Sequence, residues 1–178
     1  TEDYKAYVDT LNYHAYMHAE RGLDLDRALT HINQALEVRP DSAAFIDTRG
    51  WIYFMQGRYE EARADIVRAL ELLPDDPTIT DHMGDIEAKL GRANEALLWW
   101  RKSFLLDPTQ EKVAAKLSAQ GVDLEALRKD AEAVQKKESK PDQEPPSVLP
   151  EFDVEDAGSL LPERAPDEFV PVDELPSG

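Results

Sequence analysis

The side chains best suited to chemistry are two histidines near the beginning of the chain. His14 and His18 are four residues apart, so on a helix they would share one face and could bind a metal ion together. The intervening segment Ala15-Tyr16-Met17 supplies no carboxylate general base, and Glu20 is the one conceivable third ligand. A structural role for both histidines fits this pattern better, so we expect no metal site and no cofactor.

Catalytic groups of other kinds form no recognisable pattern. The sequence contains no cysteine, which excludes a thiolate nucleophile, a disulfide framework and a thiolate zinc site. No nucleophile stands in a known arrangement with a base, and no glycine-rich phosphate-binding loop stands out. The 37 acidic residues make neighbouring carboxylates unavoidable, so such pairs carry little information. The sequence therefore predicts a protein that is not an enzyme.

The elements that would position functional side chains repeat along the chain. Between residues 43 and 108 many residues recur 34 positions later, and a fixed period of this size predicts an array of stacked units. The recurring residues are glycines at turns and close contacts, alanines at helix contacts and prolines at helix ends. Such pairs include Asp47 and Asp81, Gly50 and Gly84, Gly57 and Gly91, Ala62 and Ala96, and Pro74 and Pro108.

Each unit is predicted to be a hairpin of two helices. Gly50 and Gly84 lack a side chain in the first helix, so the second helix can approach closely. Gly57 and Gly91 stand where the first helix should end in a left-handed conformation. The second helix then carries apolar residues at helical spacing, which in the first of these two copies are Ala62, Ile66, Ala69, Leu70 and Leu73.

An earlier copy precedes these two, because Pro40 stands 34 residues before Pro74 and the same apolar spacing precedes it. Its turn, residues 22–25, contains one extra residue. The predicted divisions are a lead-in at residues 1–8, hairpins at 9–42, 43–76 and 77–110, capping helices at 111–138 and a tail at 139–178.

Several residues carry helix-start signals. Asp76 before Pro77 predicts a cap and a first helical residue. After the last repeat, Thr109 is expected to cap a short helix that ends at Gly121, and Asp123 to cap another. Both helices have polar outer faces, which suits the end of a stacked array. A degenerate fourth repeat is the alternative interpretation.

The last 40 residues, 139–178, have the composition of a disordered acidic tail. They hold eleven acidic and two basic residues, together with eight of the twelve prolines. Two acidic-apolar clusters stand out, one with Phe152 and Val154 and one with Phe169 and Val170. These clusters are either incidental parts of a solubilising tail or peptides that dock on a partner or on the repeats.

The net charge of −17 bounds the class of partner. A surface of this sign repels phosphate backbones and anionic lipid, so we expect neither nucleic acid nor membrane contact. No apolar run of 18 residues is present in the sequence. The chain begins at Thr1 without a methionine, and we interpret it as the C-terminal part of a longer or processed protein, with further repeats possible before Thr1.

The period and spacing resemble the tetratricopeptide repeat, whose pattern runs aromatic-x2-Leu-Gly-x2-Tyr, Ala-x3-Phe and Pro. One copy reads Ile46-x2-Arg49-Gly50-x2-Tyr53, and the next reads Thr80-x2-Met83-Gly84-x2-Glu87. Arg49, Thr80 and Glu87 replace apolar residues of the pattern. The resemblance implies an all-α, right-handed superhelical array of three hairpins, which acts as a scaffold or adaptor and binds a peptide or protein in its concave groove.

Part of the first copy resembles a recurring variant of bacterial tetratricopeptide proteins. The segments concerned are residues 11–16 and 21–28. Many proteins with this variant are exported or lipid-anchored adaptors of the cell envelope. The resemblance therefore favours the bacterial envelope or periplasm and leaves the cytoplasm open.

The resemblance also implies which side chains line the groove. An aromatic wall beside an acidic row favours a ligand with apolar side chains and some basic character. Asp47 and Asp81 stand where chaperone-binding members clamp a terminal carboxylate, and their like charge excludes that clamp. Alternatively, Trp51 and Phe54 pack against the neighbouring repeat and the aspartates are merely solvated. The predicted groove residues are Asn12, Tyr16, Asp47, Trp51, Phe54, Asp81, Asp85 and Lys89.

Arg49 occupies an expected core position. We expect that it snorkels to solvent or pairs with an acid such as Asp81 or Asp85. For the whole chain a second function is also considered: the repeats would form the structural C-terminal end of a longer solenoid, and the acidic tail would be the ligand of another protein.

Overall fold

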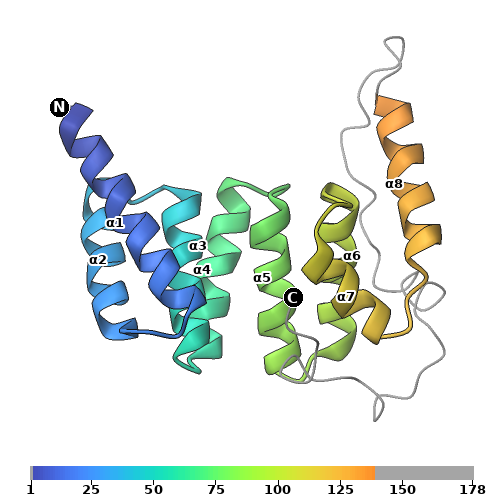
Figure 1. Ribbon diagram of the computed structural model, residues 1–178, viewed down its shortest axis with the longest axis horizontal. Helices are drawn as coiled ribbons and strands as arrows, with labels where there is room; N and C mark the ends of the chain where they lie inside the picture. Colours follow the sequence, from blue (N-terminus) through green and yellow to red (C-terminus); the bar gives the residue numbers. More distant parts are fainter. Residues whose placement is uncertain (1, 139–178) are drawn as a thin grey trace.

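The computed structural model describes residues 2–138, which form eight α-helices and no strand. The all-helical prediction is confirmed for this part of the chain (Figure 1). The predictions for residues 139–178, including the docking residues Phe152, Val154, Phe169 and Val170, lie outside the described residues. The helices are α1 (Glu2–Glu20), α2 (Leu25–Val38), α3 (Ala43–Met55), α4 (Tyr59–Leu72), α5 (Pro77–Lys89), α6 (Ala93–Leu106), α7 (Glu111–Ala119) and α8 (Leu124–Glu138).

Successive helices pair as hairpins, and the hairpins stack in chain order. The closest pairs are α1 with α2, α3 with α4, and α5 with α6. Figure 1 shows these pairs side by side from the α1 end to α7 and α8. One buried apolar core runs through α1 to α5 and a second through α6 to α8. None of the described helices is long and apolar enough to cross a lipid bilayer.

Two glycines let the helices of a hairpin touch, as the sequence predicts. A β-carbon at Gly84 would lie 2.5 Å from Nε1 of Trp100, whose ring is fully buried. A β-carbon at Gly50 would lie 2.9 Å from Cδ1 of Ile66. The large side chain of the second helix therefore occupies the space that the first helix leaves empty.

The first helices end in left-handed glycines. Gly57 has a φ of 75° and Gly91 a φ of 77°. Behind Gly57, the backbone N–H of Arg58 donates to the carbonyl of Tyr53 at 2.9 Å, which closes the helix end in a Schellman arrangement. The turn between α1 and α2 has its extra residue, and Asp24 takes it up with a φ of 46°.

Two of the three predicted helix starts are correct. The carboxylate of Asp76 accepts the N–H groups of residues 78 and 79, with Pro77 as the first helical residue. Asp123 caps α8 in the same manner. The prediction for Thr109 is wrong: its N–H and hydroxyl both donate to Asp107, so its side chain is not free to cap, and α7 begins two residues later.

Arg49 pairs with an acid, as predicted, but the acid is neither Asp81 nor Asp85. Its guanidinium binds Asp65 on α4 through two hydrogen bonds, Nε to Oδ2 at 2.6 Å and Nη2 to Oδ1 at 2.7 Å. The pair joins the two helices of one hairpin, whereas Asp81 and Asp85 lie on α5 and are bound elsewhere. The departure from the repeat pattern at Arg49 is thus matched by a second charge on the facing helix.

Glu87, another departure from the pattern, is paired in a comparable way. Its side chain is 2% exposed and accepts from Nε of Arg63 at 2.7 Å and from Nη1 of Arg92 at 3.0 Å. Arg63 comes from α4, the second helix of the preceding hairpin. Two guanidinium groups therefore compensate one buried carboxylate at the contact between hairpins.

Candidate functional site in the concave groove

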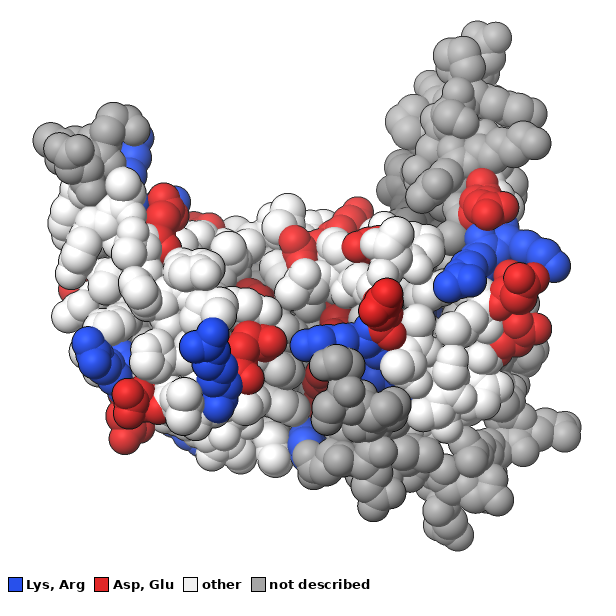
Figure 2. Space-filling model, viewed as in Figure 1, with Lys and Arg blue, Asp and Glu red and all other residues white. Residues whose placement is uncertain are grey.

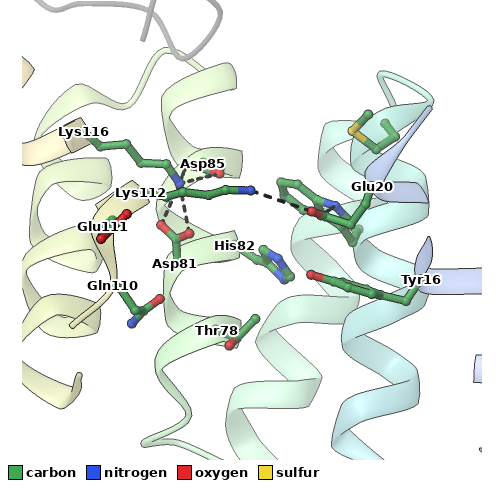
Figure 3. A pocket seen from close by; sticks show the side chains of 12 residues that line it. Tyr16, Glu20, Thr78, Asp81, His82, Asp85, Gln110, Glu111, Lys112 and Lys116 are labelled. Atoms are coloured by element: carbon green, nitrogen blue, oxygen red, sulfur yellow. Dashed lines mark hydrogen bonds and ion pairs between the residues drawn. The ribbon is translucent and has the colours of Figure 1, made fainter. Parts of the chain in front are cut away.

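The first helices of the array, α1, α3 and α5, surround a hollow together with α7. The hollow has a volume of about 660 Å³. Figure 3 shows its side chains converging, with Tyr16 and Glu20 of α1 on one side and the α7 residues on the other. Its lining consists of Tyr16, Glu20, Trp51, Met55, Thr78, Asp81, His82, Asp85, Gln110, Glu111, Lys112 and Lys116.

Trp51 forms the aromatic wall of this hollow. Its indole stacks on the imidazole of His82 with the ring centres 4.1 Å apart, and on Phe54 at 4.5 Å. Its Nε1 donates to Glu20 on α1 at 2.8 Å. Trp51 therefore contacts α1 and α5 while still lining the hollow. Phe54 itself is only 8% exposed.

A buried ion pair joins α3 to α5. Nδ1 of His82 lies 2.7 Å from Oδ1 of Asp47, and both side chains are nearly inaccessible. Burial opposes a charged imidazole, but the adjacent Asp47 carboxylate outweighs it, so the pKa of His82 is raised. Asp47 is consequently occupied by a partner within the protein.

A second bridge joins α5 to α7. Nζ of Lys116 donates to Asp81 Oδ1 at 2.7 Å and to Asp85 Oδ2 at 2.8 Å, as Figure 3 shows. Asp85 also accepts from Nε1 of Trp100 at 2.9 Å. Burial and then the nearby Asp81 raise the pKa of Asp85 to about 6. Burial disfavours the ammonium of Lys116, but Asp85 and Asp81 outweigh it and raise the pKa of Lys116.

The two bridges have the same register. His82 and Asp47 are 35 residues apart, and so are Lys116 and Asp81. In addition, α7 begins at Glu111, 34 residues after α5 begins at Pro77. The helix α7 therefore docks on α5 in the way that α5 docks on α3, which is the geometry of a first helix in a fourth repeat.

The hollow stays acidic after this internal pairing. Its lining contains four carboxylates and two lysines, a net charge of −2 with His82 balanced by Asp47. Lys112 reaches across from α7 to within 3.9 Å of Glu20 on α1. Burial and Glu20 raise the pKa of Tyr16 to about 12, so its hydroxyl remains a donor. Figure 2 shows lysine and acidic side chains meeting between α5 and α7.

The predicted groove residues separate into three groups. Tyr16, Trp51, Asp81 and Asp85 line the main hollow. A smaller adjoining hollow of about 210 Å³ is lined in part by Tyr16 and by two further predicted residues, Asn12 and Asp47. The remaining two, Phe54 and Lys89, line neither hollow.

Sequence analysis missed the contribution of α7. Lys112 and Lys116 were assigned to the polar face of a capping helix, because no repeat motif marks residues 111–119. The available signal was the period itself, which places Lys116 34 residues after His82. Among the described residues, no cluster of three or more His, Asp or Glu side chains could hold a metal ion.

Comparison with known proteins supports the fold. The family model described as the tetratricopeptide repeat matches residues 43–76. A comparison with curated proteins found no match. Among 41 matching chains of solved structures is the first TPR of Spaghetti (RPAP3) bound to the HSP90 peptide SRMEEVD, which is 17% identical, with 73% of this chain and 94% of that chain covered and a TM-score of 0.55. The described helices therefore form an array of tetratricopeptide-like hairpins.

Proposed function

We propose that this protein is a non-catalytic adaptor that binds a peptide segment of a partner protein in the hollow between α1, α3, α5 and α7. The observation that carries the proposal is the hollow itself, because four helices far apart in sequence converge on it with an exposed aromatic edge and several polar groups. Concave surfaces of stacked arrays are their usual binding faces. The RPAP3 domain bound to an HSP90 peptide is consistent with this use of the fold.

The charges around the hollow favour a ligand with basic character. The cations on its floor are already used, since Lys116 binds Asp81 and Asp85, and His82 binds Asp47. A terminal carboxylate would therefore have to compete with Asp47, Asp81 and Asp85 for these two cations and would meet a net negative lining. Apolar side chains of the ligand would contact Trp51 instead. We expect micromolar affinity, which corresponds to about −8 kcal/mol.

For this adaptor, the resemblance of residues 11–16 and 21–28 favours the bacterial cell envelope or periplasm and leaves the cytoplasm open. The alternative function, in which the acidic tail is the ligand of another protein, depends on residues 139–178, outside the described residues.

Selection of peptides on the full-length chain tests the proposal. A random peptide library displayed on phage should yield sequences that combine apolar residues with Lys or Arg. By calorimetry, the Trp51→Ala variant should bind a selected peptide at least about tenfold more weakly, the loss typical of an aromatic anchor. Leu72→Ala is the matched control, because Leu72 is an exposed apolar residue of α4 outside the hollow.

The acidic peptide SRMEEVD is the opposite probe. We expect it to bind more weakly than any selected basic peptide, because the net charge of the lining repels it. Equal affinity for SRMEEVD would contradict the basic character of the ligand. If the Trp51→Ala variant and the parent chain bound the selected peptide with equal affinity, at unchanged helicity, the peptide would not bind in the hollow and the proposal would be wrong.

A further inference from the structure

The smaller hollow beside the main one, called the small hollow below, lies between three successive first helices. Its volume is about 210 Å³. Asn12 and Tyr16 line it from α1, Asp47 from α3 and Thr78 from α5. Tyr16 and Thr78 line the main hollow as well, and Figure 3 shows Tyr16 reaching from α1 toward α5 at this junction. A ligand in the main hollow can therefore extend into the small one.

The two hollows differ in the charged side chains that line them. The main hollow contains Lys112 and Lys116, together with His82, which is bound to Asp47. Among the described residues, no lysine, arginine or histidine lines the small hollow, whose charged side chains are Asp47 and Asp76. The small hollow is therefore the better suited of the two to a positively charged group.

Asp76 supplies the negative charge of the small hollow, because Asp47 is already paired. Oδ1 of Asp76 accepts the backbone N–H groups of residues 78 and 79 at 2.9 and 3.0 Å and so caps α5. No lysine or arginine of the described chain pairs with this carboxylate, whereas the neighbouring Asp75 lies 3.6 Å from Nζ of Lys102. The positive end of the α5 dipole is equivalent to about half a charge, so the full charge of Asp76 leaves this side of the hollow negative.

Asn12 supplies an acceptor that no donor of the described chain uses. Its Oδ1 is shielded from solvent and has no hydrogen-bond partner. An unpaired buried amide oxygen is unfavourable, and no hydrogen bond to this oxygen holds the amide in its present orientation. Rotation about the last side-chain bond would turn Oδ1 toward the small hollow, where it could accept from a cationic donor.

The walls of the small hollow between these polar groups are apolar. They include Leu73, which is 45% exposed, the buried Ile79 and the ring of Tyr16. A lysine or arginine side chain combines a stem of methylene groups, which packs on apolar surface, with a charged end that needs acceptors. A purely apolar side chain would leave the acceptors unused, and an acidic side chain would be repelled by Asp76.

Given the peptide binding proposed above, on which this inference rests, we propose that the small hollow is the binding site of one lysine or arginine side chain of the peptide. The methylene groups of this side chain pack against Leu73 and Tyr16. Its charged end binds Asp76 and Oδ1 of Asn12. An apolar side chain of the same peptide packs against Trp51 in the main hollow.

The spacing of these two side chains in the ligand follows from α3. Trp51 lies four residues after Asp47, so the two are about 6 Å apart along the helix axis. In an extended peptide, residues two positions apart are roughly 7 Å apart and point to the same side. Peptides selected on the full-length chain should therefore be enriched in an apolar and a basic residue two positions apart. The absence of a preferred spacing contradicts this arrangement.

Calorimetry of the full chain with a selected peptide that contains a single basic residue tests the site. Asp76→Asn removes the charge but keeps a residue that caps helices equally well. It should weaken binding about fivefold, as for a partly exposed ion pair. Asp75→Asn removes the same charge outside both hollows and should change the affinity less than about twofold, because salt screens distant charges. Equal weakening by the two variants overturns the proposal.

Asn12→Asp tests the second contact by a gain of affinity. The substitution replaces a neutral acceptor with a charged one, so the same peptide should bind about fivefold more tightly. An unchanged or weaker affinity, at unchanged helicity, overturns the contact with Asn12.

A substitution in the peptide provides an independent measurement. Norleucine in place of the basic residue keeps a methylene stem and removes the charge. It should weaken binding to the parent chain about fivefold but leave binding to the Asp76→Asn variant almost unchanged, because both substitutions remove the same contact. Equal losses on the two chains overturn the site. If Trp51→Ala still weakens the peptide in that case, the peptide binds in the main hollow and only the place of its basic residue is wrong.

Discussion

At the scale of single residues, the charged side chains that depart from an apolar repeat pattern are bound to partners. Arg49 pairs with Asp65, and Glu87 pairs with Arg63 and Arg92. A buried pair of this kind adds little net stability, but removing one partner leaves a charge with no compensation. The energetic cost of a substitution here therefore depends on whether one charge or both are removed.

This argument predicts a specific order of stabilities. Asp65→Ala should lower the free energy of unfolding by about 3 kcal/mol, because it strands the guanidinium of Arg49. The double variant Arg49→Leu/Asp65→Leu should lose less than about 1 kcal/mol, since an apolar pair of similar volume replaces the ions. Urea denaturation measures both. A double variant less stable than Asp65→Ala would contradict the account.

The glycines give a second prediction at the same scale. Gly84→Ala places a β-carbon against the rigid indole of Trp100 and should cost about 3 kcal/mol of unfolding free energy. Gly57→Ala meets no atom within 4 Å and bears only the left-handed backbone, a cost of about 1 kcal/mol. Thermal unfolding compares them. Equal costs would show that the close helix contact at Gly84 is not tight.

At the scale of elements, α7 is attached to α5 by an ionic bridge in the same register as the one that attaches α5 to α3. Lys116 should therefore hold α7 in place. Lys116→Met leaves Asp81 and Asp85 without their cation at the contact, so amide hydrogen exchange in residues 113–119 should accelerate, whereas exchange in α3 and α4 should stay unchanged. Lys112→Met, on the same helix but 68% exposed, is the control. Equal exchange in the two variants would contradict a structural role for the bridge.

At this scale, the sequence predicted those features of the helices that recur with the repeat. The glycine spacing predicted the hairpins, the close helix contacts and the turns, because each of these features requires a glycine at a particular position. The partner of Arg49 was missed because it depends on how α3 and α4 are rotated against each other. Likewise, Phe54 shares a helix face with Trp51, as its spacing of three residues requires, but it is covered by packing against Trp51 and Tyr59 that the spacing does not encode.

At the scale of the whole molecule, the buried groups along the groove predict that stability depends on pH. The folded pKa of His82 is raised, so its contribution is complete below the unfolded value of 6.5 and is lost as pH rises through the folded pKa. The pKa of Asp85 rises from 3.8 to about 6, so the folded state keeps a proton that the unfolded state has lost. The Asp85 effect lowers the free energy of unfolding as pH rises from about 4 to about 6, and the His82 effect lowers it as pH rises above 6.5.

The expected decrease is on the order of 1 to 2 kcal/mol over this range. Urea denaturation at several pH values measures it, and the double variant His82→Gln/Asp85→Asn isolates the two groups from the rest of the acidic surface. The double variant should show a clearly smaller slope than the parent chain. An unchanged slope would mean that these two residues do not carry the effect.

The central claim, that a peptide binds in the concave hollow, is tested most directly by the tryptophan indole N–H signals in a nuclear magnetic resonance spectrum. The chain has three tryptophans: Trp51 lines the hollow, Trp100 is fully buried, and Trp99 is on α6 outside the hollow. On titration with a selected basic peptide, the Trp51 signal should move most and the Trp99 signal should stay in place. Movement of Trp99 with Trp51 unchanged would contradict the account.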